Sequence, residues 1–161
     1  MKLFLALAVL VSTTAAFADP KLTLLVNLSP AGSFQAVSNK VKGNLIKTGD
    51  AFTADKISVT VESFKTGIEL RDEHLWKHMQ ASKHPKATLT AVKGQGGKAT
   101  GTLEVNGIKK PVTMSYKVAG QEVLAKFSVK ASDFALPKAE YLGVGVDDVV
   151  NVEATFPFKA K

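Results

Sequence analysis

The chain has 161 residues, a length that predicts one domain able to bury a core of its own. It contains no Cys, which excludes disulfides, thiolate metal sites, a Cys nucleophile and a lipid-bearing N-terminal Cys. Its net charge of +7 comes from basic residues that are all Lys except one and are scattered along the chain, and this argues against a nucleic-acid partner, which favours Arg and clustered charge.

Residues 1–18 have the pattern of a cleaved secretory signal peptide. Lys2 precedes an apolar run at residues 3–11, and residues 16–18 form the A-x-A pattern that signal peptidase accepts. The run is shorter than the ~20 residues that a membrane-spanning helix needs. We therefore expect a soluble mature chain from Asp19 that is exported to the periplasm, with secretion as the alternative.

Alternation of apolar and polar residues predicts strands in the first third of the chain. The two clearest inward faces are Leu22, Leu24, Val26 and Leu28, and then Ile57, Val59 and Val61. Between them, residues 29–32 break the first strand, and Phe34 and Ala36 belong to a set of shorter strands.

Residues 66–85 interrupt this alternation with a period near 3.6, which predicts a helical insertion at about residues 68–80. The window holds the only Arg, the only Trp and all three His, namely Arg71, Trp76, His74, His78 and His84. Side chains with rigid or titratable heads are therefore concentrated in one segment, and this makes the segment a candidate functional region.

Each of these side chains has two interpretations. Arg71 and Asp72 either bind a ligand headgroup, because the planar guanidinium suits phosphate or carboxylate, or form a structural pair that anchors the insertion, with Asp133 as another possible partner. His74 and His78 would share one helix face, but the H-E-x-x-H pattern is absent, so we predict a surface or capping role and no metal site. Trp76 is expected to be a lid packed on the barrel mouth, a gate over the pocket or a foothold on a membrane interface, and these roles do not exclude one another.

In the second half of the chain, the alternation of apolar and polar residues predicts five more strands joined by short connections. Their inward faces are Ala87, Leu89 and Ala91; Ala99, Gly101, Leu103 and Val105; Val112, Met114, Tyr116 and Val118; Val123, Ala125, Phe127 and Val129; and Val150, Val152, Ala154, Phe156 and Phe158. Asn106-Gly107 predicts a two-residue hairpin, because both central residues of a type I′ turn need positive φ. Pro111 predicts an edge, a bulge or the first residues of a strand.

About eight short strands with frequent turns predict an all-β sandwich or barrel, and the short connections favour an antiparallel eight-stranded β-barrel. Such an interior either packs solid or holds one small ligand. Its predicted lining consists mainly of Val, Ala, Leu, Gly and Thr, which leaves both outcomes open. An open cavity would suit a long apolar chain, since burying about ten methylenes contributes a gross ~8 kcal/mol.

The chain resembles the YceI-like family in several motifs. The T-G-x-x-x-R-D-x-H-L motif is present as Thr66, Gly67, Arg71, Asp72, His74 and Leu75. The G-x-L-x-x-x-G-x-x-K-P-V-T hairpin is present as Gly101, Leu103, Gly107, Lys110, Pro111, Val112 and Thr113. Further matches are Pro85, the segment Ser132, Asp133 and Phe134, and the closing pair Asp148 and Val150.

This resemblance implies a lipocalin-like barrel that binds a polyisoprenoid, an isoprenoid quinone precursor or a fatty-acyl compound, without a catalytic residue, metal or cofactor. The predicted ligand-binding residues are Phe34, Ile57, Val59, Val61, Arg71, Asp72, His74, Trp76, Leu103, Met114, Tyr116, Phe127, Val129, Phe134 and Phe156. The alternative is a filled barrel that serves as an interaction or stress-protective protein with no small ligand. Transient contact with a membrane surface and a homodimer are further hypotheses about its partners.

Overall fold

The structure is a computed structural model that describes residues 18–161. The predicted signal peptide therefore lies outside the described residues, apart from its last residue. The strands are β1 (Lys21–Ser29), β2 (Ser33–Ser38), β3 (Val41–Gly43), β4 (Leu45–Thr48), β5 (Ala51–Thr60), β6 (Lys86–Gln95), β7 (Lys98–Val105), β8 (Ile108–Ala119), β9 (Glu122–Lys130), β10 (Glu140–Tyr141) and β11 (Val144–Ala160). The helices are the 3-10 helices η1 (Val61–Ser63) and η2 (Ala131–Phe134) and the α-helix α1 (Glu69–His78).

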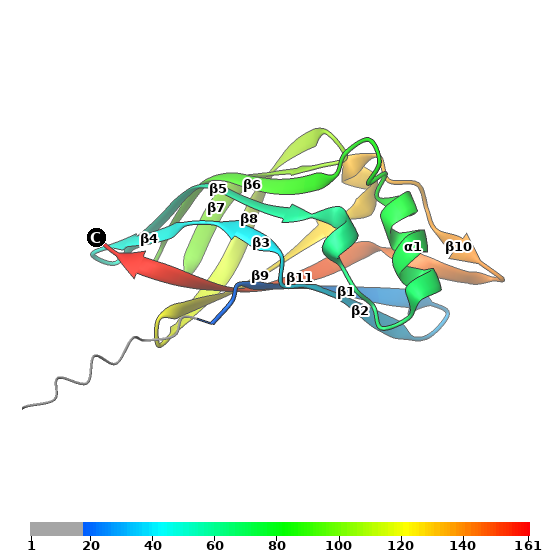
Figure 1. The fold of residues 1–161 in the computed structure, drawn as a ribbon, viewed down its shortest axis with the longest axis horizontal. Coiled ribbons are helices and arrows are strands. Elements are labelled where there is room, and N and C mark those ends of the chain that lie inside the picture. Colours follow the sequence, from blue (N-terminus) through cyan, green and yellow to red (C-terminus); the bar gives the residue numbers. More distant parts are fainter. Residues whose placement is uncertain (1–17) are drawn as a thin grey trace, which may run out of the picture.

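Seven of these strands close into a barrel, in the order β11-β4-β5-β6-β7-β8-β9, with β9 pairing back onto β11 (Figure 1). Outside this ring, β1 pairs with β11, β2 with β1, β3 with β5, and β10 with β11. The prediction of an all-β barrel with one short helix is confirmed. Eight strands and a purely antiparallel ring are not found.

One pair of neighbouring strands in the ring runs parallel, because the number of strands is odd. A closed ring in which every neighbour is antiparallel needs an even number of strands, and this ring has seven. The odd pair is β11–β4, which runs parallel from Phe158↔Leu45 to Ala160↔Lys47. The sequence motifs do not reveal this pair, because β4 and β11 lie at opposite ends of the chain.

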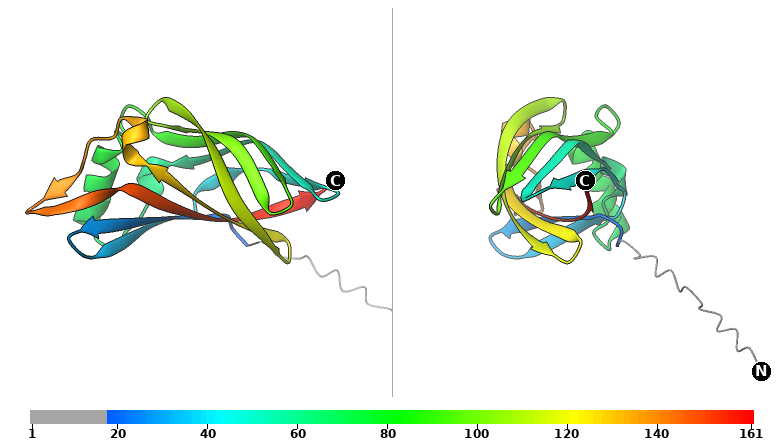
Figure 2. Two further views of the ribbon diagram at one scale, coloured as in Figure 1. Left: turned by 180° about the vertical axis from the view of Figure 1, so that it is seen from behind. Right: turned by 90° about the vertical axis from the view of Figure 1, so that its left-hand side faces the viewer.

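The barrel is narrow at one end and splayed at the other. β8 pairs with β9 only over Ser115–Ala119, so these two strands separate beyond that point. On the other side of the ring, β11 pairs with β4 through its last residues only and with β1 over most of its length. Figure 1 shows α1 and β10 at the wide end and the C-terminus at the narrow end, and the view along the long axis in Figure 2 shows the strands surrounding the interior.

Local turn predictions agree with the structure. Asn106 and Gly107 have φ values of 51° and 73° and connect the paired residues Val105 and Ile108. Pro111 lies opposite Thr102 of β7, in the part of β8 that does not pair with β9. Its missing N–H therefore falls on a strand edge, as predicted.

Two predicted inward faces need correction. The pairing of β6 with β7 shifts between Thr90 and Lys93, and Ala91 has a φ of 52°. This β-bulge exposes Ala91 and buries Val92 in its place. Val61 lies in η1 just after β5 ends, so it no longer belongs to the strand face of Ile57 and Val59, although it is buried.

The predicted helical insertion is confirmed as α1, which covers the wide end of the barrel. Acidic residues in its first turn and basic residues in its last turn suit the helix dipole. Asp72 is its one fully buried residue, so the helix owes its position to specific contacts more than to a broad apolar face. Across residues 18–161, no helix is both long and apolar enough to cross a membrane.

Candidate functional site

The barrel encloses a cavity of about 920 Å³ with largely aliphatic walls. Side chains at alternate strand positions point to the same face of a sheet, so each strand contributes a row of lining residues. β9 contributes Val123, Ala125, Phe127 and Val129, and β11 contributes Val144, Val146, Val150, Val152, Ala154 and Phe156. Val144 and Phe156 are twelve positions apart, so this wall extends for about 40 Å along the strand.

Large side chains fill the narrow end of the barrel. The Phe52 ring packs edge-on against Tyr116, with centroids 5.4 Å apart, and against Phe158, at 5.2 Å. Leu45 and Met114 are buried in the same cluster. The barrel is therefore filled at this end and hollow toward the wide end. The sequence left a packed interior and an open cavity as alternatives, and each of them describes one end of the barrel.

Exposed apolar residues surround the wide end, which we call the mouth. Ile68 and Leu70 are 53% and 60% exposed, and Tyr141 and Leu142 at the tip between β10 and β11 are 67% and 86% exposed. Together with Val144 they also line the cavity. We call these five residues the apolar rim, because the apolar surface of the cavity continues through them to the outside.

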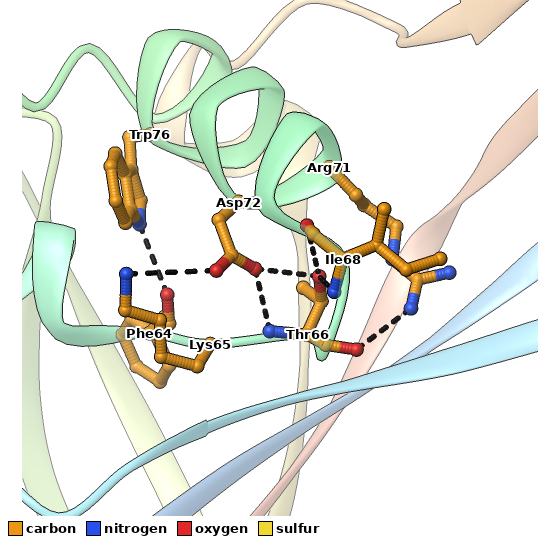
Figure 3. Close-up of polar contacts among 7 residues, drawn as sticks. All are labelled: Phe64, Lys65, Thr66, Ile68, Arg71, Asp72 and Trp76. Atoms are coloured by element: carbon orange, nitrogen blue, oxygen red, sulfur yellow. Dashed lines mark hydrogen bonds and ion pairs between the residues drawn. The ribbon is translucent and has the colours of Figure 1, made fainter.

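Asp72 attaches the start of α1 to the loop before it (Figure 3). Asp72 is 5% exposed, and its carboxylate accepts hydrogen bonds from the backbone N–H and the hydroxyl of Thr66, both at 2.6 Å, while Lys65 Nζ lies 3.6 Å away. Burial by itself raises the pKa of Asp72, but the Thr66 hydrogen bonds and the Lys65 charge bring this pKa below its ordinary value. Asp72 thus acts as a structural anchor and does not line the cavity.

Trp76 packs between α1 and η1 and does not line the cavity. Its indole Nε1 donates a hydrogen bond to the carbonyl oxygen of Phe64 at 3.1 Å, and Lys65 Nζ lies 4.4 Å from the ring centroid (Figure 3). The ring packs against the buried cluster of Val61, Met79 and Ala81. These contacts hold the helix on η1, and a role of Trp76 in gating stays a prediction.

Arg71 has a different environment from its neighbour Asp72, since its side chain lines the cavity. One guanidinium nitrogen, Nη2, donates a hydrogen bond to the carbonyl oxygen of Thr66 at 2.8 Å, and Cζ lies 4.7 Å from the centroid of the Phe34 ring. The buried Nε has no hydrogen-bond acceptor within residues 18–161. The two residues are therefore not a pair: Asp72 holds the helix, and Arg71 faces the cavity.

His74 and His78 both line the mouth. The His74 ring lies 6.2 Å from Tyr141, centroid to centroid, and burial lowers the pKa of His78. In the part of the chain that the structure describes, no group of three or more His, Cys, Asp or Glu side chains could hold a metal ion. The two imidazoles therefore add polar groups to the mouth beside the apolar rim.

The structure brings twelve of the fifteen predicted ligand-binding residues into one cavity lining. They are Phe34, Ile57, Val59, Arg71, His74, Leu103, Met114, Tyr116, Phe127, Val129, Phe134 and Phe156. Val61, Asp72 and Trp76 lie elsewhere, in the contacts between α1, η1 and the preceding loop. Contact of any of these residues with a ligand stays a prediction.

Some lining residues were not among those predicted. The inward face of β1 was recognised as a strand face but not assigned to the site; it comprises Leu22, Leu24, Val26 and Leu28. Leu136 and residues 138–142 also line the cavity at the mouth, and their sequence has no regular period that could have indicated it. Ile68 immediately precedes α1, and Leu70 is its second residue. Two apolar residues at the start of a helix are equally compatible with packing against the rest of the protein, so the sequence did not indicate that they line the cavity.

Comparisons with known proteins agree with this architecture. A family model described as YceI-like domain matches residues 13–158. A UPF0312 protein of Pectobacterium atrosepticum is 39% identical over 77 residues, which are 43% of this chain and 40% of that protein, so the chain matches less than half the length of this curated relative.

Two solved structures have a similar fold. Burkholderia cenocepacia BcnA has a TM-score of 0.67 at 19% identity, over 84% of this chain and 94% of that one. A polyisoprenoid binding domain from Saccharophagus degradans, implicated in plant cell wall breakdown, has a TM-score of 0.62 at 14% identity, over 84% and 91%. At these identities the likeness concerns the fold.

Proposed function

Because this chain belongs to the YceI-like family and its barrel holds a long apolar cavity, we propose that it binds a long-chain amphiphilic lipid and carries or stores it. The candidate ligands are a polyisoprenoid, an isoprenoid quinone precursor and a fatty-acyl compound. The polyisoprenoid-binding domain of similar fold supports the first of these. No catalytic step belongs to this proposal.

The observation that carries the proposal is the cavity itself. Its volume of about 920 Å³ lies near the upper end of the range for small-molecule sites, and its walls are aliphatic over most of their length. Burying about 15 methylenes in such a site contributes a gross ~12 kcal/mol. Micromolar affinity needs about 8 kcal/mol, which leaves ~4 kcal/mol to offset the loss of translational and chain freedom.

The first experiment is mass spectrometry of organic extracts from the purified protein. We expect a co-purifying long-chain lipid, which calorimetric titration with the identified compound would then verify. A clean extract together with no binding of added hexadecanoate, hexadecanol or a polyisoprenol would overturn the proposal and favour an interaction or stress-protective protein.

A cavity-blocking variant tests the location of the ligand. Ala125 lines the cavity and pairs with Ala154 of the neighbouring strand β11, so a Phe at this position would project from the barrel wall into the cavity. We expect Ala125→Phe to weaken lipid binding at least tenfold. The matched control is Leu124→Phe, because Leu124 is 38% exposed and points away from the cavity. Equal lipid affinity of the two variants would exclude the barrel interior as the site.

Location and partners extend the proposal. The signal pattern of residues 1–18 supports a periplasmic protein, and cell fractionation would test this. The exposed apolar rim is the face on which a transient membrane contact is expected, and cosedimentation with vesicles would detect it. A homodimer stays a prediction, for which light scattering after size exclusion is the direct measurement.

A further inference from the structure

The charged residues in the cavity lining are mostly basic. Arg71, Lys138 and Lys21 line it, against a single acidic residue, Glu140. The ion pairs within residues 18–161 are Lys65–Asp72, Lys109–Glu104 and Lys126–Glu153, so none of these three basic side chains has a carboxylate partner there. The cavity is therefore an apolar space whose charged groups favour a negatively charged ligand.

Arg71 is the basic side chain whose orientation the structure defines best. The hydrogen bond from Nη2 to the carbonyl oxygen of Thr66 uses one of its five N–H donors, and the position of Cζ over the Phe34 ring holds the guanidinium plane. Nε is buried and has no acceptor in the described chain. A buried N–H of a charged group without a partner costs free energy, which an incoming oxygen acceptor would recover.

Asp72 does not compete for Arg71. Its carboxylate accepts two hydrogen bonds from Thr66 and lies near Lys65. These contacts hold it outside the cavity lining, and no ion pair joins the guanidinium to a carboxylate within residues 18–161. The arrangement separates a structural carboxylate from an available cation on adjacent residues of one helix.

From this geometry we infer that Arg71 binds the anionic headgroup, a carboxylate or a phosphate, of a lipid whose tail lies in the barrel. The inference rests on the proposed function and adds the charge and position of the headgroup. The planar fork of Arg suits both oxyanions, which can accept two parallel N–H bonds. Because α1 covers the wide end, the headgroup lies at the mouth and the tail extends toward the filled narrow end.

The test compares hexadecyl lipids that differ only in their heads. Affinities of the full chain for hexadecanoate, hexadecyl phosphate, hexadecanol and hexadecyltrimethylammonium are measured by calorimetry below the concentrations at which these lipids aggregate. We expect the two anions to bind about 10 to 100 times tighter than the alcohol, as charged hydrogen bonds typically allow, and the cation to bind weakest. This series uses the unaltered protein and does not depend on the folding of any variant.

Variants then locate the selectivity. Arg71→Met should lose most of the preference for the anions, and its affinity for hexadecanol should change less than its affinity for hexadecanoate. Arg71→Lys keeps the charge without the planar fork and should retain only part of the preference. The control Lys77→Met removes one positive charge from the exposed side of the same helix, outside the cavity lining, and should leave the preference intact.

The outcomes separate the two proposals. Equal affinity of the unaltered protein for hexadecanoate and hexadecanol, or a preference that survives in Arg71→Met, overturns the headgroup assignment and leaves lipid binding in place. Absence of binding for every hexadecyl lipid and for a polyisoprenol, together with a clean organic extract, overturns the proposed function instead. Butanoate or inorganic phosphate binding as tightly as the lipids would reveal a site for free anions and would also overturn the headgroup assignment.

Discussion

Removing the carboxylate of Asp72 is expected to release the first turn of α1 from the loop before it. In Asp72→Ala, the N–H of Thr66 loses its acceptor, and its hydroxyl loses a short bond to a charged oxygen and keeps only the carbonyl oxygen of Ile68, 3.2 Å away. Hydrogen bonds to a charged group contribute about 1.5–3 kcal/mol each, and Thr66 is partly accessible to water, so the lower value applies to both. Lys65 is mostly exposed, and its ion pair adds less than about 1 kcal/mol.

The free energy of unfolding should therefore fall by about 3 kcal/mol, which corresponds to a decrease of roughly 10 °C in melting temperature for a domain of this size. Urea titration followed by circular dichroism measures the change directly. The control is Glu73→Gln, an exposed neighbour on the same helix, which should stay within about 0.5 kcal/mol of the unaltered protein.

The same anchor predicts a dependence on pH. Because the pKa of Asp72 is lower in the folded protein than in the unfolded chain, its stabilising contribution is complete above the ordinary carboxyl pKa and is lost as the pH falls through the lowered value. The difference in stability between the unaltered protein and Asp72→Asn should thus be largest near neutral pH and decrease below about pH 4. A loss under about 1 kcal/mol for Asp72→Ala at neutral pH, or a difference that grows in acid, would refute the anchoring role.

Three further predictions follow from named contacts. Trp76→Phe should lose about 1 kcal/mol, because the hydrogen bond to Phe64 disappears, yet should bind lipid as before; a large loss of lipid affinity in calorimetry would place Trp76 at the gate instead. Gly107→Ala should lower the free energy of unfolding by about 1–3 kcal/mol in urea titration, because φ is +73° and the new Cβ would lie 2.8 Å from His84 Cε1. If adding His84→Ala to this variant restores none of the lost stability, the contact between Cβ and His84 is not the cause. Because burial lowers the pKa of His78, the free energy of unfolding should decrease as the pH falls below about 6.5. In His78→Gln this dependence on pH should be weaker, and an unchanged dependence would show that His78 is not its cause.

Local sequence patterns determined much of the barrel. The alternating residues of β9 and β11 became lining rows as predicted, because side-chain direction in a regular strand depends only on whether a position is odd or even. The Asn106-Gly107 turn and the position of α1 followed from equally local requirements, namely positive φ and a change of period. The β-bulge at Ala91 is an exception to this alternation, because one extra residue reverses the face to which every later side chain of the strand points.

The sequence by itself thus determined an all-β chain with one helical insertion, the strand faces that point inward and the rare side chains gathered near residues 66–85. Only the tertiary structure decided that seven strands close the ring, that one pair is parallel and that one end is filled while the other is hollow. It also decided that Arg71 faces the cavity and Asp72 the loop. These features depend on residues far apart in the chain meeting across the barrel, and their combined volumes, charges and hydrogen bonds are not contained in any local pattern.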